Sequence, residues 1–102
     1  MARFSLLTLL GDEWNGKQML SEQWVKWALT PTKRNPGYAF TNWYLNTGRK
    51  LLPDVSENVF CHVGNGATVI YVDPKLDLVS AVRWIDFEDL NGFVARVRAA
   101  VK

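Results

Sequence analysis

The chain is poor in the two residue types that most often build disulfide and metal sites. Its 102 residues include one cysteine and one histidine, Cys61 and His62, which are neighbours. A single cysteine cannot form a disulfide within the chain, which excludes the cross-linked framework of small secreted proteins. A single histidine with no nearby cluster of acidic residues or cysteines does not supply the ligand set of a zinc site. We therefore expect no metal site and no cofactor.

A long hydrophobic run is also lacking. No apolar stretch approaches the roughly 18 residues that a membrane-spanning helix needs. The apolar run from Phe4 to Leu10 is short, and Gly11-Asp12-Glu13-Trp14 follows it where a signal peptide would have a small-residue cleavage site. We expect no membrane interaction and no signal peptide. The sequence does not define the cellular compartment. With no signal peptide in these residues, the chain alone would be cytoplasmic.

Neither sign of charge dominates. The chain has 12 basic and 10 acidic residues, which gives a formal net charge of +2. The basic residues are spread from Arg3 to Lys102, without a basic stripe interleaved with aromatic residues. This scatter is typical of a solvated surface, and we expect no nucleic-acid partner.

Apolar residues at helical spacing predict three helices. The first covers residues 4–10 and is apolar on most sides. The second covers about residues 21–29, with Ser21 as its N-cap. The third begins at Asp86 and continues toward the end of the chain. Its apolar face consists of Leu90, Phe93, Val94, Val97 and Val101.

Between the second and third helices the pattern becomes typical of β-strands. We expect strands at residues 38–45, 59–63, 68–72 and 78–84. The turns that join the last three are too short for parallel crossovers, so neighbouring strands should be antiparallel. The predicted fold class is α+β, with an antiparallel sheet of three to four strands, a C-terminal helix packed on it and two N-terminal helices. Residues 1–102 would form a single partial domain.

The adjacent pair Cys61-His62 is not expected to act as a catalytic dyad. Neighbouring residues on a strand point to opposite faces, so the thiol and the imidazole cannot reach each other. Cys61 shares a face with Val59 and Val63 and should be a buried thiol. His62 shares the other face with Phe60, and taken alone it would more often be a partly buried, hydrogen-bonded histidine than a catalytic one.

Four segments give the sequence a wider context, because their order resembles that of a known superfamily. They are ARFSLLTLLGDEWNGKQMLSEQWVKWALTPT, NPGYAFTNWYLN, FCHVGNGATVIYVDPKLDLVSAVRWI and a short terminal helix. Together they resemble the C-terminal part of the serine β-lactamase, penicillin-binding-protein and esterase superfamily, over nearly the whole chain. The nearest branch looks to be the class C-like serine hydrolases, which includes carboxylesterases and D-amino-acid peptidases.

In that family the third active-site motif is Lys or His, then a small residue, then Gly, at the end of a strand that lines the catalytic cleft. His62-Val63-Gly64 matches this pattern and position. The resemblance implies that His62 supplies a hydrogen bond near the substrate carboxylate or the nucleophile. It also implies that Gly64 lets the substrate lie close to the strand and that the backbone N–H of Asn65 is one oxyanion-hole donor. The face that carries His62 would then line the cleft.

The rest of the family's catalytic set is missing from these residues. Its nucleophile lies in a Ser-x-x-Lys motif, followed by a Tyr-x-Asn or Ser-x-Asn motif. No serine here has a lysine three residues on; the serines are Ser5, Ser21, Ser56 and Ser80. Tyr44-Leu45-Asn46 fits Tyr-x-Asn only by chance, on a different element. No complete catalytic site is therefore expected, and hydrolysis through another serine is disfavoured because none has a base placed by the sequence.

Two functions from different classes remain. In the first, the chain is the C-terminal piece of a β-lactamase-like serine hydrolase that keeps the cleft strand but is inactive alone; its ligand would be a small acyl compound or a peptide. In the second, it is a stand-alone binding or assembly module derived from that fold, working through a sheet edge or an aromatic groove. The substrate of any parent enzyme is not defined by either.

The strand at residues 78–84 also predicts self-association. In the resembled family this strand pairs on its outer side with an N-terminal strand that these residues do not contain. Its LVSAV core has no charge and no proline to discourage pairing with another edge. We expect a homodimer or larger homo-oligomer, joined at this strand, at residues 38–45 or through the N-terminal helices.

Overall fold

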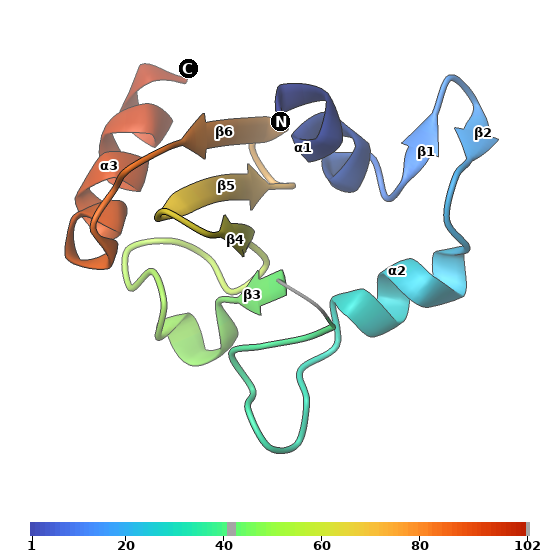
Figure 1. Cartoon of the computed structure of the whole chain (residues 1–102), viewed down its shortest axis with the longest axis horizontal. Coiled ribbons are helices and arrows are strands. Elements are labelled where there is room, and N and C mark those ends of the chain that lie inside the picture. The colour runs from blue at the N-terminus through green and yellow to red at the C-terminus, as the bar shows by residue number, and fades with distance from the viewer. Residues whose placement is uncertain (41–42, 102) are drawn as a thin grey trace.

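The fold is built on an antiparallel β-sheet that runs through the middle of the molecule (Figure 1). The computed structural model describes residues 1–40 and 43–101. Within these ranges the main sheet has four strands in the order β3-β4-β5-β6. They are β3 (Trp43–Leu45), β4 (Phe60–Gly64), β5 (Thr68–Asp73) and β6 (Leu78–Val82), and each pairs antiparallel with its neighbour. The short turns therefore join adjacent strands, as predicted.

Helices flank this sheet, and they confirm the predicted α+β class. The described residues form α1 (Ala2–Leu9), α2 (Glu22–Ala28), the C-terminal α3 (Phe87–Ala100) and a short 3₁₀ helix η1 (Thr47–Arg49). A hairpin of β1 (Glu13–Trp14) and β2 (Lys17–Gln18), which the sequence analysis marked only as a turn, connects α1 to α2. Ser21 caps α2 as predicted, since its side chain accepts a hydrogen bond of 3.1 Å from the Trp24 N–H.

The predicted strand at residues 38–45 is wrong in extent, because the chain reverses within it. The Ala39 N–H donates to the Trp43 carbonyl at 2.9 Å, and the Leu45 N–H donates to the Gly37 carbonyl at 2.9 Å. Only residues 43–45 join the main sheet. Thr41 and Asn42, which fall within the predicted strand, lie outside the described residues. Aromatic content indicates β-structure here, but it does not reveal the reversal.

Each face of the sheet has its own hydrophobic core. We call one the α3 face; its buried residues are Leu52, Val55, Val59, Cys61, Val69, Tyr71, Leu90 and Val94. We call the other the α1/α2 face; its buried residues are Ala28, Ala39, Trp43, Leu45, Phe60, Ile70 and Val72, with Leu9 of α1 packed against them. The C-terminal helix thus packs on the sheet as predicted, and α1 and α2 contribute to the opposite face.

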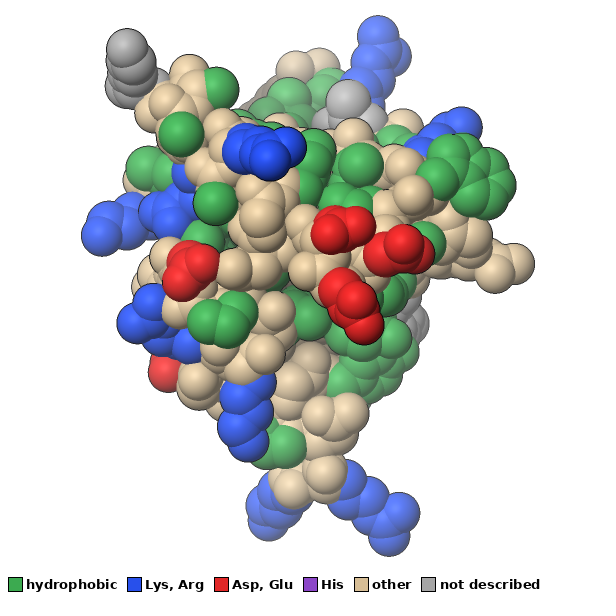
Figure 2. All heavy atoms as spheres, turned by 90° about the vertical axis from the view of Figure 1, so that its left-hand side faces the viewer, with side chains coloured by type: hydrophobic (Ala, Val, Ile, Leu, Met, Phe, Trp, Pro, Cys, Tyr) green, Lys and Arg blue, Asp and Glu red, His purple; other side chains and the backbone are tan. Residues whose placement is uncertain are grey.

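The surface carries both signs of charge. Figure 2, which views the molecule from the side where α3 lies, shows Lys and Arg side chains interspersed with acidic and apolar ones rather than gathered in a stripe. Among the described residues, none of the helices has the length and apolar character required to span a bilayer.

Candidate functional site

Strand β4 holds Cys61 and His62 in the interior of the sheet. Cys61 lies opposite Tyr44 on β3 and Tyr71 on β5, whereas His62 lies opposite Trp43 and Ile70. Cys61 belongs to the α3 face, and the neighbours of His62 belong to the α1/α2 face. The two side chains therefore point to opposite faces, as strand alternation predicts, which excludes a Cys–His dyad at this position.

Cys61 is a buried thiol, as predicted. Its side chain has no exposed surface and packs with Val59 and Val63 in the core of the α3 face. Burial raises the thiol pKa from 9.0 to about 12, because the thiolate would lose its hydration. At neutral pH the sulfur is protonated and unreactive, and Cys61 acts as a small hydrophobic side chain.

His62 is buried among aromatic rings on the α1/α2 face. Only 2% of its surface is exposed. Its ring meets the rings of Trp43, Phe4 and Phe60 edge-on, at centroid distances of 4.5, 5.2 and 5.7 Å. The shared face with Phe60 agrees with the sequence prediction, but that face is covered here rather than open as a cleft. Alternation along a strand determines the face on which a side chain lies, but not what packs over it.

The imidazole has no polar neighbour in this aromatic cage. Neither Nδ1 nor Nε2 of His62 has a hydrogen-bond partner among the described residues. Burial lowers the pKa of His62 from 6.5 to about 4, because the charged ring would lose hydration. The ring is therefore neutral at pH 7. Since buried polar groups are nearly always hydrogen-bonded, two unpartnered nitrogens mark His62 as a side chain that packing alone does not explain.

The rest of the motif becomes exposed toward the turn between β4 and β5. Val63 is half-buried, and Gly64 and Asn65 are exposed. The register between β3 and β4 ends at Trp43 and His62, so Val63 and Gly64 have no strand partner on that side among the described residues. The structure therefore brings the four predicted residues together at one strand end, which becomes exposed at Gly64.

Backbone conformation and packing explain the glycine at one position near this turn but not at the other. At Gly66 the backbone has a φ of +73°, and an added Cβ would lie 3.1 Å from the Trp84 indole, so the fold requires glycine. At Gly64 an added Cβ would meet nothing closer than Thr68 at 3.9 Å, an ordinary contact. Packing within the described residues therefore does not explain Gly64.

The serines do not complete a catalytic site. Ser5 is fully buried on α1 and donates its hydroxyl to the Met1 carbonyl at 2.9 Å, while Ser21 caps α2. Ser56 accepts a hydrogen bond of 3.1 Å from the Asn58 N–H. No hydrogen bond within the described part of the chain joins a serine to His62. An activated serine nucleophile is thus not present among these residues.

Asn46, from the chance Tyr-x-Asn match, organises the loop that leads to β4. It is fully buried, and its Nδ2 donates to the carbonyls of Leu52 at 3.0 Å and Ser56 at 2.9 Å. Its Oδ1 accepts a 2.8 Å hydrogen bond from the Leu52 N–H. The amide is committed to backbone groups of the loop, so its role is structural.

A second polar cluster, which the sequence analysis did not identify, fixes α3 to the sheet. The Tyr71 hydroxyl donates to Asp73 Oδ2 at 2.8 Å, and Arg98 Nε of α3 lies 3.3 Å from the same oxygen. Asp73 Oδ1 accepts from the N–H groups of Lys75 at 3.1 Å and Leu76 at 3.3 Å. Burial and the bond to Asp73 raise the pKa of Tyr71. The Tyr-Val-Asp-Pro segment thus serves to anchor the helix.

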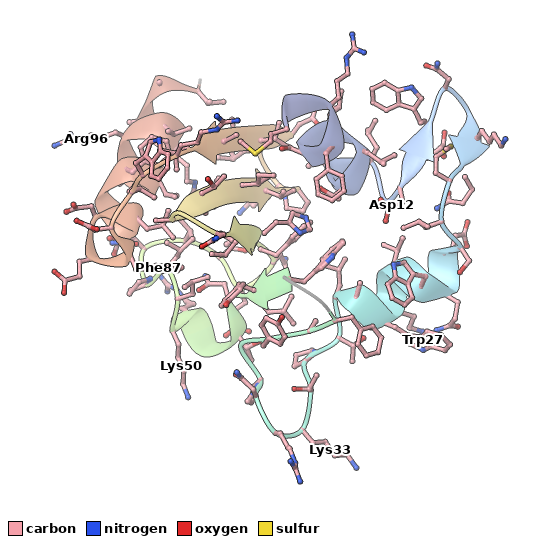
Figure 3. All side chains as sticks on the ribbon, in the orientation of Figure 1. Asp12, Trp27, Lys33, Lys50, Phe87 and Arg96 are labelled. Atoms are coloured by element: carbon pink, nitrogen blue, oxygen red, sulfur yellow. The ribbon has the colours of Figure 1, made fainter. Side chains whose placement is uncertain are left out.

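Asp12 is a further buried ionisable side chain. It lies on the N-terminal side of the molecule, between α1 and β1 (Figure 3). It is 2% exposed and has a left-handed backbone, with a φ of +62°. Its Oδ2 has no hydrogen-bond partner within the described ranges, and burial raises its pKa. The sequence analysis did not identify it, because nothing in the pattern around Gly11-Asp12 indicates burial.

The cavities do not coincide with the His-x-Gly strand end. A cavity of about 440 Å³ lies at the other end of β4 and is lined by residues that include Leu29, Leu45, Glu57, Val59, Phe60 and Pro74. A cavity of about 280 Å³ lies between Arg3, Phe4, Leu7 and Trp14. No group of three or more His, Cys, Asp or Glu side chains that could hold a metal occurs among the described residues.

Comparison with known proteins adds no family to this description. No protein-family model matches the chain, and neither the curated proteins nor the solved structures include one that is significantly similar to it.

Proposed function

We propose that these residues form the cleft-strand part of a β-lactamase-like serine hydrolase and do not hydrolyse substrate on their own. The observation that carries the proposal is the environment of His62. A neutral imidazole with two unpartnered nitrogens lies buried just before the point where β4 becomes exposed. Such a group costs stability unless another molecule or segment supplies its hydrogen bonds.

Each residue of the motif would have a separate role. His62 would hydrogen-bond the substrate carboxylate or a nucleophile supplied by the rest of the enzyme. Gly64, which packing does not require to be glycine, would let an acyl or peptide substrate lie against the strand next to Val63. The backbone N–H of Asn65 would stabilise the developing oxyanion. Access to His62 would require Phe4 or Trp43 to move aside.

The missing nucleophile limits what these residues can do. Acyl transfer needs a serine with a base within hydrogen-bond reach, and the described residues contain no such pair. The chain therefore contributes substrate contacts and an oxyanion donor but not the covalent step.

An activity assay tests the proposal. We expect no hydrolysis of a chromogenic β-lactam or a p-nitrophenyl ester above the rate of a His62→Ala control. We also expect no change in intact mass after treatment with a fluorophosphonate probe. Burst kinetics, or an adduct on any serine, would contradict the proposal because either one requires a nucleophile within this chain.

A second candidate is favoured by the position of β6 at the edge of the sheet. An assembly module derived from the same fold would use this edge to form a homodimer or larger homo-oligomer. The two candidates make different genomic predictions. A reading frame that continues upstream of Met1 and encodes a Ser-x-x-Lys helix favours the hydrolase, and a stop codon with a ribosome-binding site there favours the module.

A further inference from the structure

Strand β6 is the longer edge strand of the main sheet, and α1 packs beside it and β5. Within the described residues it pairs only with β5, and its other side has no strand partner. Of the strand residues Leu78–Val82, Ala81 is exposed and the others are half-buried. Such an edge presents a row of backbone N–H and C=O groups that another strand can satisfy.

Strand β6 is flanked by two residues of opposite charge. Asp77 directly precedes β6, and Arg83 directly follows it. Both side chains are exposed. The one salt bridge within the described part of the chain joins Arg98 to Asp73. Asp77 and Arg83 therefore have no ionic partner among the residues that the structure describes.

We infer that two copies of this chain pair their β6 strands antiparallel about a two-fold axis at Ser80. In that register Leu78 of one copy faces Val82 of the other. Asp77 and Arg83 lie just outside the strand, in the turn and the bend that flank it, and Asp77 has a left-handed backbone with a φ of +52°. The antiparallel pairing brings Asp77 of each copy near Arg83 of the other, so the seam has opposite charges at both ends. A strand that is complementary to itself in this way fits a second copy better than it fits an unrelated edge.

The faces of the sheet agree with this register. Leu78 and Val82 are half-buried hydrophobic residues that pack against the core of the α3 face. Facing each other across the seam, they extend that core from one copy into the next. The two four-stranded sheets become one continuous sheet, and no charged residue lies within the five paired positions.

The apolar side chains of α1 and α2 are a weaker candidate for the dimer contact. Phe4, Leu10 and Trp27 are exposed there, but nothing on these helices specifies a second copy over any other partner. The two-fold register at β6 instead makes a prediction about charge that can be tested residue by residue.

Sedimentation or light scattering at tens of micromolar tests the inference. We expect a mass of twice the 11.6 kDa of one chain. Asp77→Arg and Arg83→Asp each place like charges opposite each other at both ends, and each should raise the dissociation constant by about tenfold or more. The double variant restores opposite pairs and should return it to near the parent value. Arg96→Asp, which makes the same charge change at an exposed position of α3, should leave it unchanged.

A second measurement uses the parent sequence and so does not depend on the folding of any variant. Hydrogen exchange should show amides of residues 78–82 that become protected as concentration rises, while the amides of β5 stay constant. A monomer at about 100 µM would overturn the inference, since it would mean that the edge is left open or needs a different partner. A dimer whose dissociation constant is unchanged by both charge reversals would also overturn it. The inference rests on the second candidate function, the assembly module that uses this edge. Neither result bears on hydrolysis, so a failure here leaves the outcome of the activity assay unaffected.

Discussion

The two faces of the sheet differ in how well their buried carboxylates are partnered. On the α3 face the buried Asp73 accepts four contacts, from Tyr71, Arg98 and two backbone N–H groups. On the α1/α2 side, Asp12 and His62 are equally buried but leave polar atoms without partners among the described residues. Asp73 is therefore fully partnered, whereas Asp12 and His62 are not. Asn91 Oδ1 and Arg98 Nε of α3 also lack a hydrogen-bond partner among the described residues, so the contrast concerns the buried carboxylates rather than every polar atom of each face.

Exposed apolar side chains follow the same division. Most of the large ones lie on α1, the β1–β2 hairpin, α2 and the loops next to them; they are Met1, Phe4, Leu6, Leu10, Met19, Leu20, Trp27, Leu29 and Phe40. Beyond β6 the corresponding residues are Trp84, Phe87 and Val101. Exposed hydrophobic surface beside unpartnered buried polar groups indicates a surface that receives another segment or molecule. Under the proposed function, the rest of the hydrolase would meet the chain on this side.

The largest expected effect comes from removing the fully partnered carboxylate of Asp73. Asp73 uses both carboxylate oxygens as acceptors, so the amide of Asp73→Asn would turn an NH₂ group toward existing donors. We expect the free energy of unfolding to fall by roughly 2–4 kcal/mol, measured by urea denaturation.

Asp12→Asn is the matched control at a buried carboxylate that has an unpartnered oxygen. Burial already disfavours the charged carboxylate of Asp12, and asparagine tolerates its left-handed backbone. We expect stability at pH 7 to be unchanged or to rise by up to about 1 kcal/mol. A loss as large as that of Asp73→Asn would remove the contrast between the two faces.

His62 gives a smaller effect at neutral pH but a distinct pH dependence. His62→Leu replaces an unpartnered imidazole by an apolar side chain of similar volume, so at pH 7 stability should rise by about 1 kcal/mol. His62→Ala should instead lose stability because it opens a cavity among Trp43, Phe4 and Phe60.

Acid titration separates the two protonation states of His62. The folded chain keeps the ring neutral down to a pKa of about 4, whereas the unfolded chain binds the proton near the ordinary value of 6.5. Lowering the pH from 6.5 to 4 therefore favours unfolding, by at most about 3 kcal/mol. Urea denaturation across this range should show that loss in the parent and lack it in His62→Leu. An identical pH dependence in both would mean that His62 is not buried in solution.

Local patterns in the sequence predict the framework of the fold but not its tertiary contacts. Turn residues and strand periods place β4, β5 and β6 closely, and the Ser21 cap locates α2, because each signal acts within a few residues. The reversal inside residues 38–45 and the hairpin β1–β2 depend on short backbone pairings that leave little trace in composition.

The candidate site shows the same limit. Alternation correctly separates Cys61 from His62, since it depends only on strand geometry. The cover over His62 comes from Phe4, which is 58 positions away in the chain, so no local pattern reports it. The contact between Arg98 and Asp73 joins a helix to a strand in the same way. Sequence therefore predicts the face on which a side chain lies better than it predicts what surrounds that side chain.

A graft tests the central claim that this chain supplies a working cleft strand. Its residues would replace the corresponding C-terminal segment of an active class C-like esterase, and ester hydrolysis by the folded chimera would be measured, with folding checked by circular dichroism. We predict measurable kcat/KM that falls about 100-fold or more in both His62→Ala and Gly64→Val, because both changes remove contacts needed in the transition state. A folded chimera without activity, or one whose activity survives both substitutions, would contradict the account.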